Sequence, residues 1–294
     1  MKIHHLNLCT FCPYGGRLWS GGDRSIFDVA DGAVHSLLVE TERDGLVLVD
    51  TGMGLDDVRA PRERLGAGFL AVSRPQLREE DTAIRQVERL GFSRKDVRHV
   101  VVTHLDLDHA GGIPDFPEAK IHVHRPEQVA AMNPTTLNER GRYRKVHFAH
   151  GPRWELHDAG GGDRWFGFDS IRALAEDVLL IPLPGHTRGH AGVAVRTKEP
   201  GGPEWLLHAG DSYFFHREKE DPAHCPPLLK QFQKLTAVDD AVRRANAKRI
   251  RELHREHGRT VRVFSAHCPN EFRELAKSEP DRSTAWRADP ARAT

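Results

Sequence analysis

The sequence is poor in the features that would place a chain in a membrane, in a disulfide scaffold or on a nucleic acid. It has only 4 cysteines in 294 residues, which does not suggest a disulfide framework. No apolar run approaches the roughly 20 residues that span a bilayer, and residues 1–6 lack the apolar core of a secretory signal. The net charge of +1 gives no basic excess for a polyanion. These absences predict a cytoplasmic protein without a membrane or nucleic-acid partner.

Histidine, in contrast, is abundant. The chain holds 19 histidines, and imidazole is the commonest metal ligand in proteins. Hydrophobic residues make up 38% of the chain and charged residues 29%, a composition typical of a globular protein with a substantial core. The places of the histidines relative to the predicted strands are therefore the first question about function.

Apolar runs rich in β-branched residues indicate a protein with many strands. The Asp44–Gly45 pair between two such runs predicts a hairpin turn. The expected strands cover residues 3–9, 34–40, 46–49, 97–102, 120–124, 178–183, 192–196, 204–208 and 260–264.

Helical spacing of apolar residues predicts two clear helices. One covers residues 79–90, with Gly91 as its stop. The other is long and begins near Thr236, where Thr236 and Asp239 have the spacing of a capping box. Residues 133–176, rich in arginine, glycine and aromatic residues, break the pattern and are expected to form an insertion or cap.

The densest chemical signal is a short run that follows a predicted strand. Four metal-capable side chains, His104, Asp106, Asp108 and His109, stand within six residues and are followed by two glycines. Burying so many ionisable groups without a counter-charge costs several kcal/mol per group. A bound cation is the simplest compensation.

Three later apolar runs also end in a ligand-type residue. These residues are His186, Asp211 and His267, each a few positions after its predicted strand. Because sites are built on loops at one edge of a sheet, we expect these side chains to meet the run at 104–109.

Five motifs, in this order, give the chain a resemblance to the metallo-β-lactamase superfamily of binuclear metallohydrolases, over most of residues 30–270. The motifs are Asp50-Thr-Gly52, His104-Leu-Asp-Leu-Asp-His109, Pro184-Gly-His-Thr-Arg-Gly-His190, Gly210-Asp211 and Ser265-Ala-His267. The resemblance implies an α/β fold, a four-layer αββα sandwich, with the metals at one edge. We expect one such domain over residues 1–277 and a polar tail at 278–294. Within the domain, the stretch 133–176 is expected to be an insertion that selects the substrate, and its aromatic residues suggest a pocket with an apolar wall.

The resemblance also implies two metal sites that share one carboxylate. His104, Asp106 and His186 would hold the first metal, and Asp108, His109 and His267 the second. Asp211 would bridge both, and Asp50 would tie the metal loops together without touching metal.

The chain departs from the family at one ligand, because Asp106 stands where the common motif has histidine. The extra carboxylate lowers the formal charge of an occupied centre by one and adds an oxygen donor. Two zinc ions are the default expectation, and manganese or iron is the alternative that Asp106 favours.

Within the family, the motif spacing looks most like the N-acyl-homoserine lactonase branch. This predicts a small-molecule substrate, a lactone or related ester, opened by attack of a metal-bridging hydroxide, with Asp108 receiving the proton. That branch usually has a catalytic tyrosine three residues after the bridging aspartate. Here Tyr213 stands one residue early and Phe214 takes the matching place. Tyr213 is still a candidate catalytic residue if the loop turns it toward the metals, and a packing role is the alternative.

Other functions are compatible with the same motifs. They are a thioesterase of the glyoxalase II type, an iron-dependent redox enzyme and a non-catalytic metal-binding module. A homo-oligomer is compatible with the sequence, which does not indicate the oligomeric state. His122, His124 and His190 are expected to have packing or structural roles.

Overall fold

A computed structural model describes residues 1–160, 163–174, 177–197 and 201–277 and contains two large β-sheets. The strands of the first sheet, in spatial order, are β4 (Pro75–Gln76), β1 (Lys2–Phe11), β2 (Gly32–Glu40), β3 (Leu46–Val49), β5 (Val97–Val101), β6 (Lys120–His124) and β7 (Arg153–His157). Those of the second are β10 (Ile171–Leu174), β11 (Val178–Pro182), β12 (Ala191–Arg196), β13 (Trp205–His208) and β14 (Val261–Phe264). A short ribbon pairs β8 (Arg164–Trp165) with β9 (Phe168–Asp169).

Helices lie between the strands along the chain. The α-helices are α1 (Arg17–Ser20), α2 (Leu55–Arg59), α3 (Pro61–Arg64), α4 (Ala67–Ser73), α5 (Ala83–Arg89), α6 (Leu107–Ala110), α7 (Arg125–Met132), α8 (Leu137–Arg142), α9 (Pro227–Thr236), α10 (Asp240–His257) and α11 (Pro269–Ala276). The 3₁₀ turns are η1 (Glu79–Asp81), η2 (Arg94–Asp96), η3 (Ile113–Asp115), η4 (Lys145–Phe148) and η5 (His216–Lys219).

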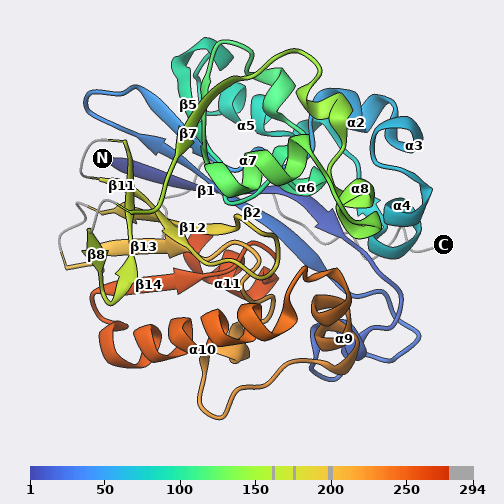
Figure 1. Cartoon of the computed structure of the whole chain (residues 1–294). Coiled ribbons are helices and arrows are strands. Elements are labelled where there is room, and N and C mark those ends of the chain that lie inside the picture. Colours follow the sequence, from blue (N-terminus) through green and yellow to red (C-terminus); the bar gives the residue numbers. More distant parts are fainter. Residues whose placement is uncertain (161–162, 175–176, 198–200, 278–294) are drawn as a thin grey trace.

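The two sheets pack face to face, with helices outside each of them (Figure 1). Successive residues of a strand point to opposite faces, and the buried clusters follow this rule. Leu37 of β2 packs in a cluster with Val193 of the second sheet, whereas its neighbour Leu38 packs with Val87 of α5. Behind the second sheet, Ile250 of α10 packs in a third cluster. The four-layer α/β sandwich predicted from the motifs is confirmed.

Most predicted strands are present within one or two residues of their expected bounds. The hairpin turn between β2 and β3 is also confirmed, and Gly45 adopts a positive φ of 75° there, which glycine accepts at little cost.

Both predicted helices differ from expectation at their starts. The helix expected over 79–90 is divided, because Thr82 is extended (ψ 149°) between η1 and α5. The long helix begins at Asp240, and Asp239 caps it alone by accepting a hydrogen bond from the backbone N–H of Val242 at 3.0 Å. Thr236 instead ends the preceding helix α9, so the predicted capping box is wrong.

The stretch 133–176 is less separate than an insertion would be. Its strand β7 extends the first sheet beside β6, and β10 extends the second sheet beside β11. Residues 278–294, expected to be a polar tail, lie outside the described residues. The division into one domain and a tail stays a prediction.

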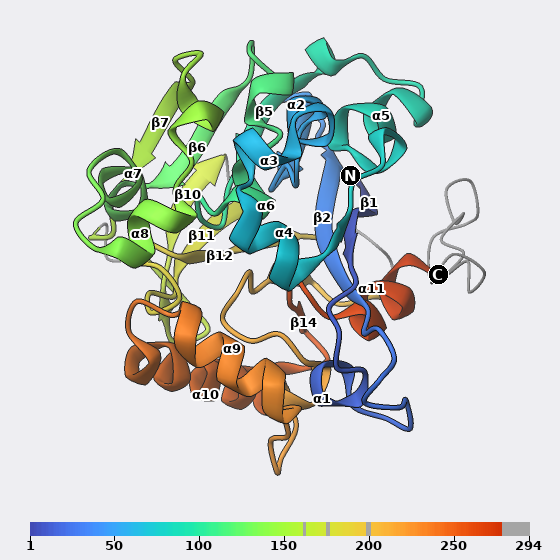
Figure 2. The ribbon, with the colours of Figure 1, turned by 90° about the vertical axis from the view of Figure 1, so that its right-hand side faces the viewer.

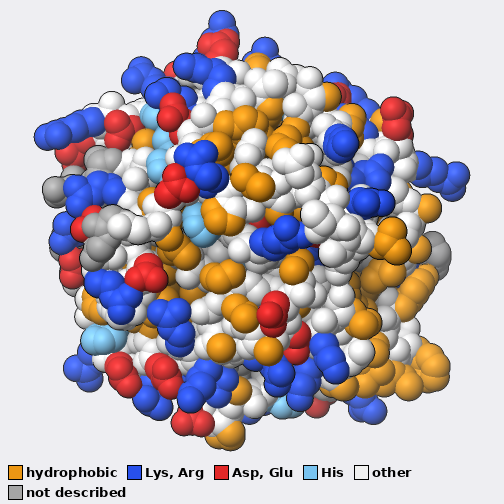
Figure 3. Space-filling view, in the orientation of Figure 1, with side chains coloured by type: hydrophobic (Ala, Val, Ile, Leu, Met, Phe, Trp, Pro, Cys, Tyr) orange, Lys and Arg blue, Asp and Glu red, His pale blue; other side chains and the backbone are white. Residues whose placement is uncertain are grey.

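The surface shows no single-sign patch on the face drawn in Figure 3, where basic and acidic side chains are interspersed. Hydrophobic side chains gather at the lower right of this view, over α9 and the loop that precedes β2 (Figure 3). Leu235 (66% exposed) and Phe27 (87% exposed) belong to these two segments. Among the described residues, no helix combines the length and apolarity needed to cross a membrane.

Candidate metal centre

Four strand ends converge on one edge of the sandwich. β11, β13 and β14 run in the same direction within the second sheet, so their carboxyl ends meet at one edge. His186, Asp211 and His267 follow these ends, and His104 follows β5 of the facing sheet. The predicted convergence of the four apolar runs is therefore present.

The run 104–109 owes its geometry to the short helix α6. Asp106 precedes the helix, and its carbonyl accepts hydrogen bonds from the backbone N–H groups of His109 (3.0 Å) and Ala110 (2.9 Å). This turn brings Asp108 and His109 to the same edge as His104, although the segment contains no regular strand.

Two groups of side chains that could each hold a cation lie side by side. In each group the ligand atoms all lie within 4.8 Å of one another. One group is His104, Asp106 and His186, and the other is Asp108, His109 and His267. These are the two sets that the resemblance implies.

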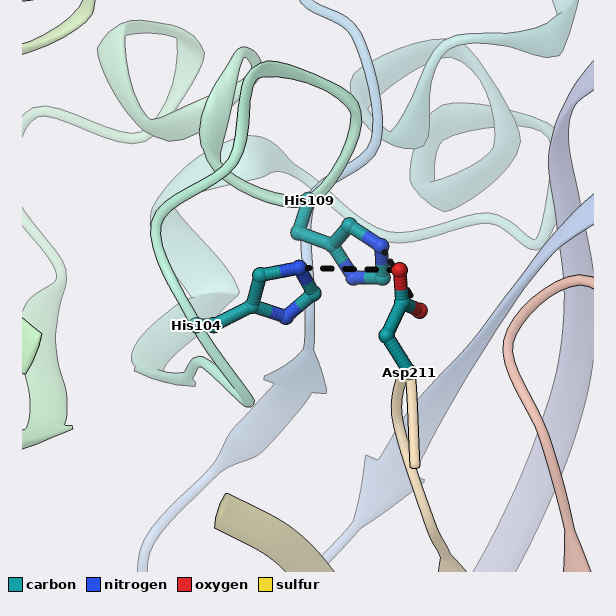
Figure 4. A group of neighbouring side chains, drawn as sticks. All are labelled: His104, His109 and Asp211. Carbon is teal, nitrogen blue, oxygen red and sulfur yellow. Dashed lines mark ion pairs between the residues drawn. The ribbon is translucent and has the colours of Figure 1, made fainter. Parts of the chain in front are cut away.

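Asp211 stands between the two groups and faces each of them with a different oxygen. Its Oδ2 lies 3.8 Å from His104 Nε2 and 3.3 Å from His186 Nε2. Its Oδ1 lies 3.4 Å from His109 Nε2 and 3.1 Å from His267 Nε2. Figure 4 shows Asp211 approaching His104 and His109 from the opposite side of the centre. This is the placement that a bridging carboxylate requires.

The polar atoms at the centre fit a cation because several of them make no hydrogen bond within the protein. His104 Nε2, Asp106 Oδ1 and Asp211 Oδ1 are buried without a hydrogen bond. Buried polar atoms are rarely left unpaired, since each one costs about 1–3 kcal/mol. His109 Nε2 and His267 Nε2 also face each other at 3.3 Å, and a shared cation or proton would satisfy this contact.

The outer ring nitrogens are held by the surrounding protein. His109 Nδ1 lies 2.8 Å from Asp50 Oδ2, His104 Nδ1 lies 2.9 Å from Thr103 Oγ1, and His267 Nδ1 lies 2.8 Å from the carbonyl of Ala33. In each case the nitrogen donates, which fixes the ring and turns Nε2 toward the centre. Such partners are typical of metal-binding histidines.

Asp50 connects the two loops that carry these histidines. It is buried and accepts hydrogen bonds from the backbone N–H of Thr103 (2.7 Å), from Thr103 Oγ1 (2.8 Å) and from His109. Burial would raise the pKa of Asp50, but the adjacent His109 lowers it below the ordinary value. Asp50 therefore lies where the resemblance implied, behind the ligand-type residues.

Glu127 is a second connecting carboxylate, which sequence reasoning missed. It is buried and accepts from the backbone N–H of Leu105 (2.9 Å), the hydroxyl of Thr187 (2.6 Å) and the N–H of Gly189 (3.0 Å). It thus joins the loop of His104 to the loop of His186. Gly189 is required at this contact, because a Cβ there would come within 2.0 Å of the Glu127 backbone nitrogen.

Asp106 has a cationic neighbour that the sequence did not indicate. Arg142 of α8 places its Nη1 3.5 Å from Asp106 Oδ2. Burial would raise the pKa of Asp106, but Arg142 and His104 hold it well below the ordinary value. Arg142 lies within the arginine-rich stretch of the sequence, but no motif distinguished it from the other arginines there.

Tyr213 does not reach the centre, which speaks against the catalytic role expected for it. Its side chain is fully buried in a hydrophobic cluster, and its hydroxyl donates to Glu271 at 3.0 Å. The neighbouring Phe214 lines the cavity beside the centre instead. The alternation of the chain after Asp211 turns position 213 inward and position 214 toward the centre.

A cavity of about 800 Å³ opens at the centre and runs between α1, α4 and α9. Asp106, Asp108, His186, Asp211 and His267 stand at its inner end. Its wall is mostly apolar, and the aromatic residues in it are Phe11, Trp19, Phe69, Phe214, Phe215 and Phe232. In Figure 2, α9 lies beside α1, and the ring centroids of Trp19 and Phe232 are 5.4 Å apart.

This wall corrects an expectation about the stretch 133–176. Its aromatic residues were expected to line the pocket, but Trp165 and Phe168 pack beside α10, and Tyr143 and Phe148 pack with the first sheet. The stretch contributes polar residues to the cavity, among them Arg142. The amphipathic helix α9, which supplies Phe232, was the signal that sequence reasoning overlooked.

His122 and His190 make contacts that fit the packing or structural roles expected of them. His122 lies between His99 and His157, at 2.9 Å from each. His190 donates to the carbonyl of Leu183 and accepts from the backbone N–H of Asp211 at 2.9 Å, which supports the turn that carries Asp211.

Comparison with known proteins agrees with this geometry. The family model of the metallo-beta-lactamase superfamily matches residues 29–202. A probable metallo-hydrolase of Mycobacterium bovis is 41% identical over 280 residues, which cover 94% of this chain and 83% of that protein. An N-acyl homoserine lactonase of Azorhizobium caulinodans is 32% identical and covers 81% of this chain and 83% of its own length.

Solved structures show the same fold. A structure of an N-acyl homoserine lactone hydrolase with N-hexanoyl-L-homoserine at its catalytic metal centre has a TM-score of 0.68 at 21% identity, covering 93% of this chain and 95% of that one. A dizinc quorum-quenching lactonase has a TM-score of 0.61 at 17% identity, covering 92% and 90% of the two chains. The chain therefore belongs to the metallo-β-lactamase superfamily and is a metal-dependent hydrolase of that family.

Proposed function

We propose that the protein is a binuclear metal-dependent hydrolase that opens the ring of a lactone, or cleaves a related ester, with a large apolar substituent. The observation that carries the proposal is the position of Asp211, whose two carboxylate oxygens face the two ligand groups separately. The cavity beside these groups supplies the space for a substrate.

In this proposal His104, Asp106 and His186 would hold one cation, Asp108, His109 and His267 would hold the other, and Asp211 would be shared between them. Zinc is the expected metal, with manganese or iron as the alternative. When bound, the two cations would supply a water of lowered pKa and positive charge beside the substrate carbonyl.

In this proposal the side chains around the centre orient the metal-binding histidines and accept a proton. Asp50 and Thr103 fix the rings of His109 and His104 through their outer nitrogens. Asp108 lies at the cavity wall with its Oδ2 3.6 Å from His267 Nε2. In this proposal it would receive the proton lost by the attacking water. Tyr213 takes no part, since its hydroxyl is engaged by Glu271.

The cavity supports an ester or lactone with a long apolar part. Such a group would lie along Trp19, Phe215 and Phe232, whereas the reacting carbonyl would lie at the inner end, where the carboxylates and imidazoles are. The lactonase relatives favour a lactone as the reacting group. The preference for an apolar substituent is an inference from this wall alone.

The proposal is tested by comparing an acyl-homoserine lactone, a simple aliphatic lactone and a thioester, each with and without a chelator. We expect hydrolysis of the acylated lactone that chelation abolishes and that His109→Ala removes. His99→Ala is the matched control, because His99 is half-buried in the His122 cluster outside the two ligand groups. Activity that survives both chelation and His109→Ala would refute the proposal. Turnover of the thioester alone would refute the lactone assignment and support the thioesterase alternative.

A further inference from the structure

Asp106, which stands where the common motif has histidine, forms an ion pair with the buried Arg142. Oδ2 of Asp106 lies 3.1 Å from His186 Nε2, 3.5 Å from His104 Nε2 and 3.5 Å from Arg142 Nη1. One carboxylate oxygen therefore faces both imidazoles of the first ligand group and the guanidinium.

Arg142 is held in place by neutral acceptors on its other side. It donates to the carbonyl of His186 at 3.0 Å, to the carbonyl of Thr236 and to Oδ1 of Asn138 at 3.2 Å. The residue is only 9% exposed. Within the part of the chain that the structure describes, Asp106 is the one carboxylate that forms an ion pair with it. Its charge is therefore directed at the first ligand group.

A buried guanidinium beside a cation site requires compensation. Removing one partner of a buried ion pair leaves an uncompensated charge and is strongly unfavourable. A neutral histidine at position 106 would leave Arg142 as a bare cation next to the bound metal. A carboxylate at 106 without Arg142 would lower the formal charge of the centre by one.

We propose that Asp106 and Arg142 act as one unit, in which Arg142 positions the carboxylate and restores the charge that the exchange of histidine for aspartate removes. The pair then has the same formal charge as the histidine of the common motif. The charge argument for manganese or iron is thereby cancelled, and only the oxygen donor of Asp106 still favours these metals. Arg142 acts through Asp106 and is a positioning residue, not a catalytic one.

The inference rests on the proposed metal centre, and a double-mutant cycle on zinc binding tests it. The proteins are wild type, Asp106→His, Arg142→Gln and the double variant, each stripped of metal. Zinc affinity is measured by competition with a chromophoric chelator, and bound zinc is counted by elemental analysis. Neither readout uses activity.

We expect Asp106→His alone to weaken zinc binding at the first group at least tenfold, because Arg142 then opposes the metal. Adding Arg142→Gln to Asp106→His should recover that affinity. The change in zinc affinity caused by Arg142→Gln should therefore differ at least tenfold between the protein with Asp106 and the protein with His at that position. Arg142→Lys with Asp106 in place keeps the charge and should bind zinc like wild type.

The outcomes separate the two proposals. An equal effect of Arg142→Gln in both backgrounds would assign Arg142 a merely structural role, through its bonds to His186 and Thr236, and would overturn the inference. Wild type that fails to bind two zinc ions would overturn the metal centre itself. A thermal melt of each metal-free variant identifies one that has failed to fold. If Arg142→Gln fails, Arg142→Lys replaces it in the cycle. Because lysine keeps the positive charge, Arg142→Lys should not recover the zinc affinity that Asp106→His has lost.

Discussion

Exchanging Asp50 for asparagine isolates the contribution of the connecting carboxylate to metal binding. Asp50 has a left-handed backbone, with φ at 58°, and asparagine is one of the few residues that adopts this conformation readily. The amide oxygen can still accept from the Thr103 N–H, and the amide nitrogen can donate to Thr103 Oγ1. The bond from His109 Nδ1–H is lost, because that donor would then face another donor.

The magnitude follows from this single bond. A hydrogen bond to a charged group contributes about 1.5–3 kcal/mol, and about 1.4 kcal/mol corresponds to a factor of ten in affinity. Asp50→Asn should therefore weaken zinc binding at the second group about 10- to 100-fold, the usual range for residues that orient a metal-binding histidine. Asp50→Ala also loses both bonds from Thr103 and adds about 1–2 kcal/mol of backbone strain, so it should lower the free energy of unfolding as well.

The assay is chelator competition on metal-free protein, with urea unfolding of the same samples. The expected pattern is weaker zinc binding in both variants, with a loss of unfolding free energy that is larger in Asp50→Ala than in Asp50→Asn. If Asp50→Asn bound zinc as tightly as wild type, the role assigned to Asp50 in orienting His109 would be refuted.

Three further predictions follow from individual side chains. Tyr213→Phe should keep the kcat/KM of wild type and lose about 1 kcal/mol of unfolding free energy with the Glu271 bond; a large drop in kcat would restore a catalytic role. Phe232→Ala should lower kcat/KM for a long-chain acyl lactone about tenfold more than for a short-chain one, and an equal loss for both would place the acyl group elsewhere. Burial raises the pKa of Asp115 to about 6, above an unfolded value of about 3.9. The contribution of this carboxyl to the free energy of unfolding is therefore fully present below about pH 4 and is lost as the pH rises through 6. Urea unfolding of wild type and Asp115→Asn should therefore diverge from pH 4 to 7, with the variant gaining on the order of 2 kcal/mol, and parallel curves would contradict this.

The ligand-type residues of the centre could be found from the sequence because they follow four apolar runs, the first of which leads into the whole segment 104–109. The position of a strand end is a local property, and the edge shared by β11, β13 and β14 brings their following residues together. The four layers could be predicted for a similar reason, since alternating residues such as Leu37 and Leu38 mark the two faces of a strand.

What could not be predicted depends on contacts between distant segments. Arg142 meets Asp106 only because α8 packs beside the His186 loop, and no local pattern encodes that approach. The aromatic wall of the cavity likewise combines Trp19 with Phe232, from opposite ends of the chain. The start of α10 was misplaced because Thr236 and Asp239 are both good capping residues, and the end of α9 decides between them.

The most direct test of the account is a zinc titration of metal-free protein in which bound zinc and hydrolysis of a long-chain acyl-homoserine lactone are measured in the same samples. Two ligand groups joined by Asp211 predict two equivalents of bound zinc per chain, with hydrolysis that is absent before zinc is added and maximal at the second equivalent. A single equivalent, or hydrolysis by the metal-free protein, would contradict the binuclear centre.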